Sequence, residues 1–411
     1  MKKLLSLRDA RVYLIGQGLS LLGDTSLWLA AGIWVKTLTR SNTDAGLVFF
    51  FFGLAGLSAP AAGMIVDRIR RKRLLIVVNL LSACAVLLLL FVHSAHDVWI
   101  VYLVMVLYGL SGALISSGQS AFLTVMIPDE LLGDANGFLS TVREGLRLIA
   151  PLVGAGLFVL VGGGVVAVID AVSFVAAAVA TSLVRTPEPI PVRKEQHFLR
   201  EASEGFRHVL GTPILRRMSL SLAVALLFVG FGETVAFAVV SSGLHKAPSF
   251  LGVILAIQGV GALAGGLTSA PAMRRLGEPR LIGIGLAGAG VACFAWTVPS
   301  LAFVAPGTVV FGASLPWIIV GAVTLIQRRT PADLQGRAYS AFDLLASVPQ
   351  TVSIGAGALL IGVLGYRSEL LMMAVPLMVA ALVMGTAQRD DAAPDASPLV
   401  VGDAKLAAEV A

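Results

Sequence analysis

Twelve long apolar runs limit what this 411-residue chain can form more than any other feature of its sequence. A helix needs about 20 mostly apolar residues to cross the hydrocarbon core of a bilayer. The runs cover residues 12–35, 44–65, 74–92, 98–122, 135–161, 164–184, 218–240, 249–270, 280–298, 301–326, 337–363 and 369–387. Because 57% of the chain is hydrophobic and only 13% is charged, a water-soluble fold could not bury so much apolar surface. We therefore expect an all-α integral membrane protein with twelve transmembrane helices.

The basic residues predict which side of the membrane each loop faces. If both termini are cytoplasmic, and Arg143 and Arg147 near the inner end of the fifth span are counted there, all but four of the 30 Lys and Arg residues fall on the cytoplasmic side. The four exceptions are Lys36, Arg40, Lys246 and Arg367. An excess of basic residues marks cytoplasmic loops. We therefore expect a multi-pass protein whose two termini are both cytoplasmic.

The sequence contains two copies of one unit. A shift of 203 residues aligns 128–135 with 331–338, and both segments read Pro, an acid, Leu, Gly and Ala at matching positions. In the first span of each half the shift is 209, which aligns Gly-Asp-Thr at 23–25 with Gly-Glu-Thr at 232–234. Two parallel repeats of this kind are the architecture of many secondary transporters, with the substrate site between the halves. We predict two pseudo-symmetric six-helix bundles.

The spans and the polar segments between them divide the chain into four parts. We expect an N-terminal six-helix bundle at 1–184, a cytoplasmic linker at 185–217, a C-terminal six-helix bundle at 218–388 and a disordered cytoplasmic tail at 389–411. Apolar residues recur at helical spacing in the middle of the linker, with charged residues between them. This pattern predicts an amphipathic helix that lies on the inner membrane surface and tethers the two halves.

The loop between the second and third spans carries a recognisable motif. Residues 63–73 read Gly-Met-Ile-Val-Asp-Arg-Ile-Arg-Arg-Lys-Arg. This resembles the cytoplasmic signature of the Major Facilitator Superfamily, although Arg70 stands where the pattern has its second glycine. The matching residues are Gly63, Asp67, Arg68, Lys72 and Arg73. Segments 121–139 and 150–154 resemble the branch of this superfamily that contains macrolide-efflux proteins and the enterobactin exporter.

We interpret this loop as a cytoplasmic gate formed by Asp67, Arg68 and Lys72, together with Gly63 and Arg73. The acid can lie against the positive end of a neighbouring helix, and the bases can pair with acids on adjacent spans. Such contacts exist only while the cytoplasmic ends of the two halves are closed. The alternative is that the bases only anchor the loop on the cytoplasmic side.

Four acids inside the apolar runs are candidate proton or substrate sites, namely Asp24, Glu144, Glu233 and Asp343. A charge at the bilayer centre costs at least about 2.5–3.5 kcal/mol, so each should face a bundle interior or water. Asp24 and Glu233 are the strongest pair because they are equivalent in the repeat. The resemblance implies that their spans line the central cavity. The alternative for both is a buried acid that a neighbouring hydroxyl satisfies.

Other intramembrane residues have competing interpretations. Glu144 has two arginines within one turn on its own helix, so an ion pair within the helix is an alternative to proton binding. For Asp170 we expect helix capping or packing rather than transport. Trp28 and Trp317 are expected among the aromatic residues that line a cavity for a bulky amphipathic ligand.

The fifth span contains a small-residue motif, Gly145, Pro151 and Gly154. It is similar to the span-five signature of antiporters in the superfamily, from which it departs by having Ala150 before the proline and Ala155 after the last glycine. Small residues let helices approach closely, so helix packing is an equally good interpretation. The fourth span lacks the arginine that many drug–proton antiporters carry there.

The resemblance implies a secondary-active, proton-coupled exporter of a lipophilic or amphipathic small molecule, such as a drug, a macrolide or a siderophore-like compound. It would act by alternating access in a bacterial cytoplasmic membrane. The alternatives are a metabolite importer or facilitator, or a lysolipid flippase, of the same fold. A membrane enzyme or receptor has no motif in its favour, and no phosphate-binding loop is present. We expect a monomer whose partners are substrate, protons and lipid, with no cofactor, metal or nucleic acid.

Overall fold

The computed structural model describes residues 2–66, 68–188, 198–331 and 334–386, and all the regular structure in these ranges is helical. The helices are α1 (Lys2–Ser6), α2 (Arg8–Thr39), α3 (Asn42–Gly56), α4 (Ala59–Val66), α5 (Arg71–Leu87), η1 (Leu88–Phe91), η2 (Ala95–Asp97), α6 (Val98–Met126), α7 (Asp129–Leu183), α8 (Phe198–Gly211), α9 (Pro213–Val229), α10 (Gly232–Ala238), η3 (Val239–Gly243), η4 (Pro248–Phe250), α11 (Leu251–Leu276), α12 (Glu278–Trp296), α13 (Leu301–Arg329), α14 (Gln335–Leu364) and α15 (Tyr366–Gly385). The predicted all-helical membrane fold is confirmed.

Ten stretches of these residues are long and apolar enough to cross a membrane as single units. Two of the twelve predicted spans differ from this simple form. The second span is divided into α3 and α4 by a turn at Leu57 and Ser58. Pro60 follows two residues later and has no N–H to donate to the carbonyl of Gly56, the last residue of α3. The fifth and sixth spans are joined in α7, which turns at Gly162.

The turn in α7 has an equivalent in the second half. Gly162 has a φ of 79° and Gly365 a φ of 73°, and the two glycines are 203 residues apart, which is the repeat shift. Only glycine adopts this conformation without strain. The same backbone geometry therefore separates the fifth span from the sixth and the eleventh from the twelfth. The structure thus repeats at the shift that the sequence predicted.

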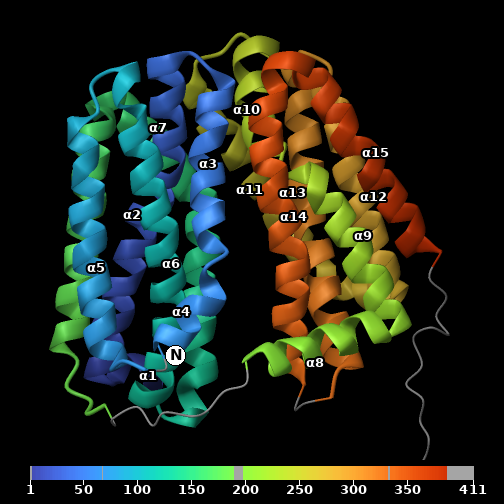
Figure 1. Cartoon of the computed structure of the whole chain (residues 1–411). Coiled ribbons are helices and arrows are strands. Elements are labelled where there is room, and N and C mark those ends of the chain that lie inside the picture. The colour runs from blue at the N-terminus through green and yellow to red at the C-terminus, as the bar shows by residue number, and fades with distance from the viewer. Residues whose placement is uncertain (1, 67, 189–197, 332–333, 387–411) are drawn as a thin grey trace, which may run out of the picture.

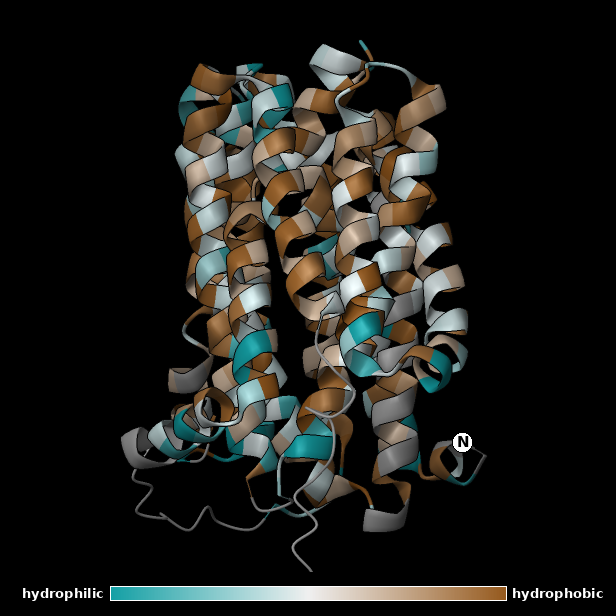
Figure 2. Ribbon diagram, turned by 90° about the vertical axis from the view of Figure 1, so that its right-hand side faces the viewer, coloured by the Kyte–Doolittle hydropathy of each residue, from teal (hydrophilic) through white to brown (hydrophobic). Residues whose placement is uncertain are grey.

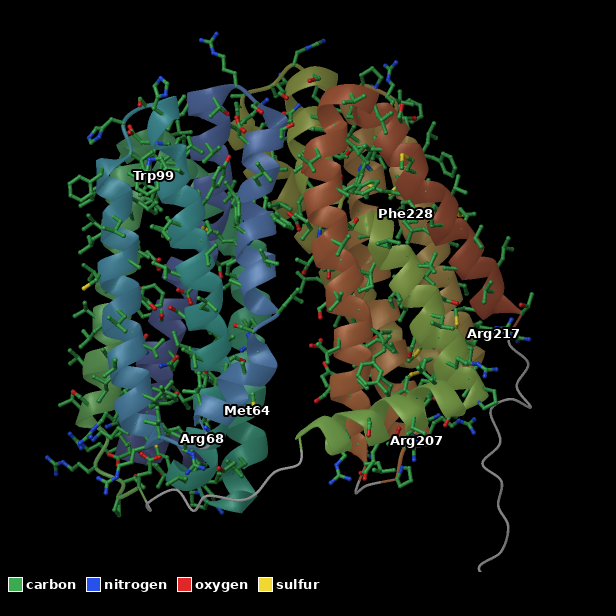
Figure 3. The ribbon with its side chains drawn as sticks, viewed as in Figure 1. Met64, Arg68, Trp99, Arg207, Arg217 and Phe228 are labelled. Atoms are coloured by element: carbon green, nitrogen blue, oxygen red, sulfur yellow. The ribbon has the colours of Figure 1, made fainter. Side chains whose placement is uncertain are left out.

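The helices form two groups that lie side by side (Figure 1). Helices α2–α7 make one group and α9–α15 the other, and α8 lies across one end of the second group. We call the end that carries α1 and α8 the linker side, and the opposite end the far side. Hydrophobic residues line the lengths of the helices, and hydrophilic residues gather toward their ends (Figure 2). The side chains of Arg68, Arg207 and Arg217 lie toward the linker side and Trp99 near the far side (Figure 3).

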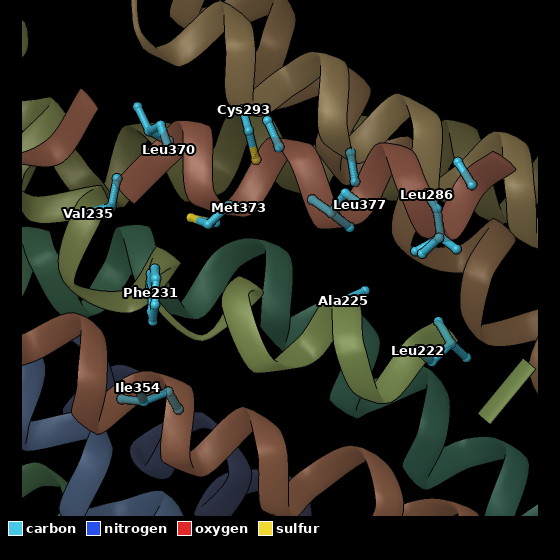
Figure 4. Packing of buried hydrophobic residues seen from close by; sticks show 14 of the residues in the cluster. Leu222, Ala225, Phe231, Val235, Leu286, Cys293, Ile354, Leu370, Met373 and Leu377 are labelled. Carbon is cyan, nitrogen blue, oxygen red and sulfur yellow. The ribbon is translucent and has the colours of Figure 1, made fainter. Parts of the chain in front are cut away.

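The outer surfaces of both groups are apolar, as a bilayer requires. The side chains of Leu160, Leu267 and Val363 are 81%, 80% and 81% exposed. In water such exposure would be costly, whereas lipid tails accept it. Interior packing instead uses small and medium side chains. In the second half, Leu222, Ala225, Phe231 and Val235 of the seventh span pack with Met373 and Leu377 of α15 and with residues of α12 and α14 in one buried cluster (Figure 4).

The linker is attached to both groups. At its start, one carboxylate oxygen of Asp9 accepts hydrogen bonds from the backbone N–H of Arg185 (2.8 Å) and of Thr186 (2.9 Å). This contact fixes the end of the sixth span to the start of α2. Residues 189–197 lie outside the described residues, and α8 follows them.

Helix α8 occupies the predicted position within the linker, and it packs against the second group. Arg337 donates to Glu204 at 2.6 Å, and His208 Nε2 lies 3.2 Å from the hydroxyl of Thr330. Val209 is fully buried in the second core, and Phe206 packs against it. The apolar face that we expected on the membrane surface is therefore, in its described part, covered by the second bundle.

Candidate functional site

A row of three aromatic rings joins the two halves of the molecule. The rings of Trp28 and Phe49 are 4.5 Å apart between centroids, and those of Phe49 and Phe237 are 6.0 Å apart and stacked. Trp28 lies on α2, Phe49 on α3 and Phe237 on α10, so the row runs from the first half to the second. Offset and tilted arrangements at these separations are favourable for aromatic pairs.

Two acids lie directly beneath this row, on its linker side. Asp24 precedes Trp28 by four residues on α2, and Glu233 precedes Phe237 by four residues on α10. Residues four apart lie on the same face of a helix. Both helices run from the linker side to the far side, so each acid is one turn closer to the linker side than its aromatic partner. Both acids are partly exposed.

The repeat therefore holds for the site and not only for the fold. The shift of 209 residues that relates Asp24 to Glu233 also relates Trp28 to Phe237. Each half contributes one acid and one aromatic residue in the same arrangement, and Phe49 lies between the two aromatic residues. Phe49 and Phe237 are 3% and 1% exposed, and of the three rings only Trp28 is partly exposed. The two acids suit a proton, and Trp28 beside Asp24 suits contact with an apolar group of a ligand.

On the far side of the row the two halves are in close contact. A Cβ atom added to Gly32 would lie 2.9 Å from the Phe237 ring. One added to Gly46 would overlap the Thr234 hydroxyl and lie 3.2 Å from Ala358. Glycine lets the backbones of α2 and α3 approach α10 and α14 this closely. The far side is therefore sealed by helix packing in this conformation.

On the linker side, several glycines of α3, α4, α7 and α11 have open space beside them. A Cβ atom added to Gly56, Gly63, Gly145 or Gly266 would meet no other atom within 4 Å. Asp343, in the linker-side half of α14, is exposed. Figure 1 shows the two groups of helices meeting at the far side and standing apart at the linker side. The partly exposed acids thus face the side on which the halves are separated.

Asp24 has a partner network that the sequence did not reveal. The hydroxyl of Tyr108 on α6 lies 2.8 Å from Asp24 Oδ1 and 3.1 Å from Asp170 Oδ2. Asp170, on the sixth span in α7, is fully buried, and the Ser173 hydroxyl lies 3.3 Å from its other oxygen. A Cβ atom on Gly23 would come within 2.5 Å of Asp170 Oδ1, so only glycine admits this carboxyl beside α2.

The interpretation of Asp170 as a helix cap is wrong, although the expected packing is present. Asp170 lies in the interior of its helix and is hydrogen-bonded to a side chain of another helix. The one signal in the sequence was an acid inside an apolar span with no base nearby. Glu233, by contrast, has no hydrogen bond from its side chain among the described residues.

The remaining predicted site residues lie in different surroundings. The side chain of Glu144 and that of Pro151 lie outside the described residues, as does Asp67. Trp317 Nε1 on α13 donates to the carbonyl of Gly265 (3.1 Å) and lies 3.0 Å from the Thr268 hydroxyl. This indole therefore joins two helices of the second half.

The predicted gate loop is bonded to its own half in this conformation. Lys72 Nζ donates to the carbonyl of Val184 at 2.6 Å, and the backbone N–H of Lys72 donates to the Glu188 carboxylate at 3.1 Å. Arg71 also lies 3.8 Å from Glu188. The acid occupies the start of α5, where it satisfies free backbone donors. Arg68 and Arg73 are exposed, as expected while the linker-side ends are apart.

The small-residue motif of the fifth span contacts the first span. A Cβ atom on Gly154 would overlap the backbone of Ser26 and lie 2.9 Å from its Cα, whereas one on Gly156 would meet nothing within 4 Å. We expect Gly154→Ala to lower the stability of the folded protein by about 1–3 kcal/mol, because the added methyl group meets backbone that cannot move aside. Thermal unfolding of the detergent-purified protein measures this loss. Gly156→Ala, one half-turn away, is the matched control. Equal melting temperatures for the two variants would contradict the close approach.

The comparison with protein families decides what kind of protein carries this site. The model of the family described as "Major Facilitator Superfamily" matches residues 13–242 and 220–406. The chain belongs to the Major Facilitator Superfamily. It is therefore a multi-pass membrane transporter and not an enzyme, and the resemblance drawn from the loop motif is confirmed. Among the described residues, no group of three or more His, Cys, Asp or Glu could hold a metal ion.

Two relatives within the superfamily differ in how much of the chain they match. Macrolide efflux protein A of Streptococcus pyogenes is 25% identical over 199 residues, which are 46% of this chain and 48% of that protein. The chain thus spans about half the length of this relative. The MFS-type transporter YfiS of Bacillus subtilis is 23% identical over 398 residues, which are 90% of this chain and 91% of that protein.

Solved transporters share the fold at low sequence identity. The POT family transporter PepTSo has a TM-score of 0.74 at 13% identity, with 94% of this chain and 98% of that chain covered. A bacterial homologue of the iron transporter ferroportin, at 92% and 98% coverage, has a TM-score of 0.71 in its inward-facing state and 17% identity. The outward-facing state of that homologue has a TM-score of only 0.61.

Proposed function

We propose that this transporter is a proton-coupled exporter of a lipophilic or amphipathic small molecule, working by alternating access. The observation that carries the proposal is the repeated pair of an acid and an aromatic residue, Asp24 with Trp28 and Glu233 with Phe237. The acids can exchange protons, Trp28 is partly exposed, and the buried rings of Phe49 and Phe237 would offer an apolar surface to a bulky ligand once the halves separate there. The partial match to macrolide efflux proteins supports export and this class of substrate.

The sidedness of the molecule supports the same direction of transport. The linker side carries the great majority of the basic residues, so we assign it to the cytoplasm. In the present conformation the two acids then face the cytoplasm, and the aromatic row and the far-side contact close the path outward. Substrate would reach the acids from the cytoplasm or the inner leaflet. Separation of the far side would then expose them to the outside.

The acids and the rings have different roles in this scheme. Asp24 and Glu233 bind protons, or one of them binds a proton and the other a cationic or hydroxylated group of the substrate. Export follows if binding of protons from outside and binding of substrate from inside exclude each other at this site. Opening and closing are governed by the far-side glycine contact and by the loop that contains Asp67.

Proteoliposomes test the proposal directly. The purified protein is reconstituted, and uptake of a macrolide or a lipophilic dye into inside-out vesicles is measured with and without an imposed pH gradient. We expect accumulation only when the gradient is present, and its collapse when a protonophore is added. Equal rates with and without the gradient would instead support a facilitator of the same fold, and uptake in the opposite sense would support an importer.

The gate loop gives a separate prediction. Asp67→Asn should reduce transport at least about tenfold while leaving membrane insertion intact, because the neutral amide loses its attraction to a helix end and to nearby bases. Distances between spin labels on the linker-side ends of the two halves should show a larger open fraction. The comparison variant is Lys72→Arg. It keeps the positive charge of the side chain that donates to the Val184 carbonyl. Unchanged transport by Asp67→Asn would leave the loop as a topology anchor.

A further inference from the structure

We propose that Asp24 and Asp170 hold one proton between them, bridged by the Tyr108 hydroxyl, and that this pair is the proton site of the first half. The proposal deepens the proton coupling proposed above, on which its transport test rests. It assigns functions to Asp170 and Tyr108, which the repeat did not single out. It also makes the first half differ from the second, where the described residues give the Glu233 side chain no such partner.

The first argument is a count of hydrogen atoms. The Tyr108 oxygen lies 2.8 Å from a carboxylate oxygen of Asp24 and 3.1 Å from one of Asp170. A tyrosine hydroxyl has one proton to donate, and an ionised carboxylate has none. Two hydrogen bonds at this oxygen therefore require a second proton, which one of the carboxyl groups must carry. With both acids ionised, one carboxylate would face the hydroxyl oxygen without any hydrogen between them.

The second argument concerns charge. Two carboxylates within hydrogen-bond distance of one oxygen repel each other, and such pairs keep a proton on one member. The surroundings offer no compensation. Tyr108 packs against the rings of Phe52 on α3 and Phe174 on α7. Asp170 is fully buried, and its remaining oxygen faces the Ser173 hydroxyl.

Among the described side chains of α2, α3, α5, α6 and the sixth span, no basic group faces the pair. The fifth span, which packs along α2, has Arg143, whose side chain is exposed, and Arg147, whose side chain lies outside the described residues. On α2 the nearest base along the helix is Lys36, twelve residues away, and it donates to the Arg40 carbonyl. The one charged residue of α3 is Asp44 near its far-side end, and the bases of α5 lie in its first turn. Helix α6 has no charged residue, and the sixth span has Asp170 alone. None of these described groups neutralises the pair, and in the proposal a shared proton does so.

The positions of the two acids allow the proton to move. Asp24 is partly exposed beneath the aromatic row, whereas Asp170 is closed off between α2, α6 and α7. Tyr108 can accept a proton from one acid while it donates its own to the other, so one proton passes between them with no change in the total. Asp24 would thus exchange protons with water or contact the substrate. When its proton moves through Tyr108, Asp170 would retain that proton inside the bundle.

Infrared spectroscopy of the purified protein tests proton sharing without any substrate or gradient. The measurement follows the carbonyl band of protonated carboxyl groups at pH 7 in a detergent without ester groups, with D₂O exchange to identify the band. The double variant Asp24→Asn, Asp170→Asn should lose the intensity of one carboxylic acid relative to wild type. An unchanged band intensity, or a loss equal to two carboxylic acids, would overturn the proposal. Tyr108→Phe should shift the band through loss of its hydrogen bond, and an unshifted band would exclude the bridge.

Measurement of transport provides the second test of the proposal. Each coupled proton multiplies the accumulation ratio about tenfold per pH unit of gradient, so Asp170→Asn should lower that ratio by about this factor. Glu369→Gln, which removes a buried acid of α15 far from the triad, should leave the ratio unchanged. If wild type shows no pH-driven transport, the proposed coupling fails, but the infrared result still decides whether the pair shares a proton. An unchanged ratio in Asp170→Asn would overturn the role in coupling.

Discussion

The double variant Asp24→Asn, Glu233→Gln is expected to lose pH-driven efflux while retaining exchange of substrate down its own gradient. A neutral amide resembles a protonated acid in size and hydrogen bonding, so the variant should fold and insert normally. It cannot release a proton, so the transporter loses the reaction that couples the pH gradient to movement. With a gradient of one pH unit we expect at least about a tenfold fall in accumulation for each coupled proton.

The single variants separate the roles of the two acids. Asp24 is tied to Tyr108 and Asp170, whereas the Glu233 side chain has no hydrogen bond among the described residues. Loss of substrate binding with an unchanged pH profile would assign that residue to ligand recognition. Full pH-driven transport by the double variant would show that the coupling acid lies elsewhere, with Asp343 and Glu144 as the next candidates. Glu369→Gln is the control for loss of a buried acid as such.

Gly46→Leu is expected to drive the molecule out of the present conformation. The added side chain would collide with Thr234 of α10 and Ala358 of α14, both of which belong to the other half. Overpacking of this kind costs about 1–3 kcal/mol. The far-side contact is absent in the conformation that is open on that side. The substitution therefore destabilises only the present conformation, in which the contact is made. The ratio of the two conformations should change by about fivefold to more than a hundredfold.

Distances between spin labels on the far-side ends of the two halves measure this shift. The distance distribution should move toward longer separations in Gly46→Leu, and substrate affinity measured from the linker side should fall. Gly266→Leu is the matched control, because a side chain there meets no atom within 4 Å. An unchanged distribution in Gly46→Leu would mean that α3 and α10 separate little during the cycle, and that the far side opens elsewhere.

Much of this architecture is determined by the sequence alone. Lipid replaces water as the solvent, so a run of about 20 apolar residues is sufficient to predict a spanning helix. The repeat shift of 203 reappeared in the structure as matching turns at Gly162 and Gly365. The paired acids at 24 and 233 likewise lie in equivalent positions beside equivalent aromatic residues. Each of these features depends on local hydropathy or on comparison of one half with the other.

What the sequence could not determine is how each helix is rotated and which helix it meets. Asp170 is 146 positions from Asp24, and they share a hydroxyl only because Gly23 lets the sixth span pack closely against α2. The hydrogen bond from the Trp317 indole of α13 to the Gly265 carbonyl of α11 likewise joins residues 52 positions apart. Apolar periodicity is weak in a helix that faces lipid on one side and protein on the other. The contacts of small residues between distant segments decide the rotation of each helix, and only the tertiary structure contains them.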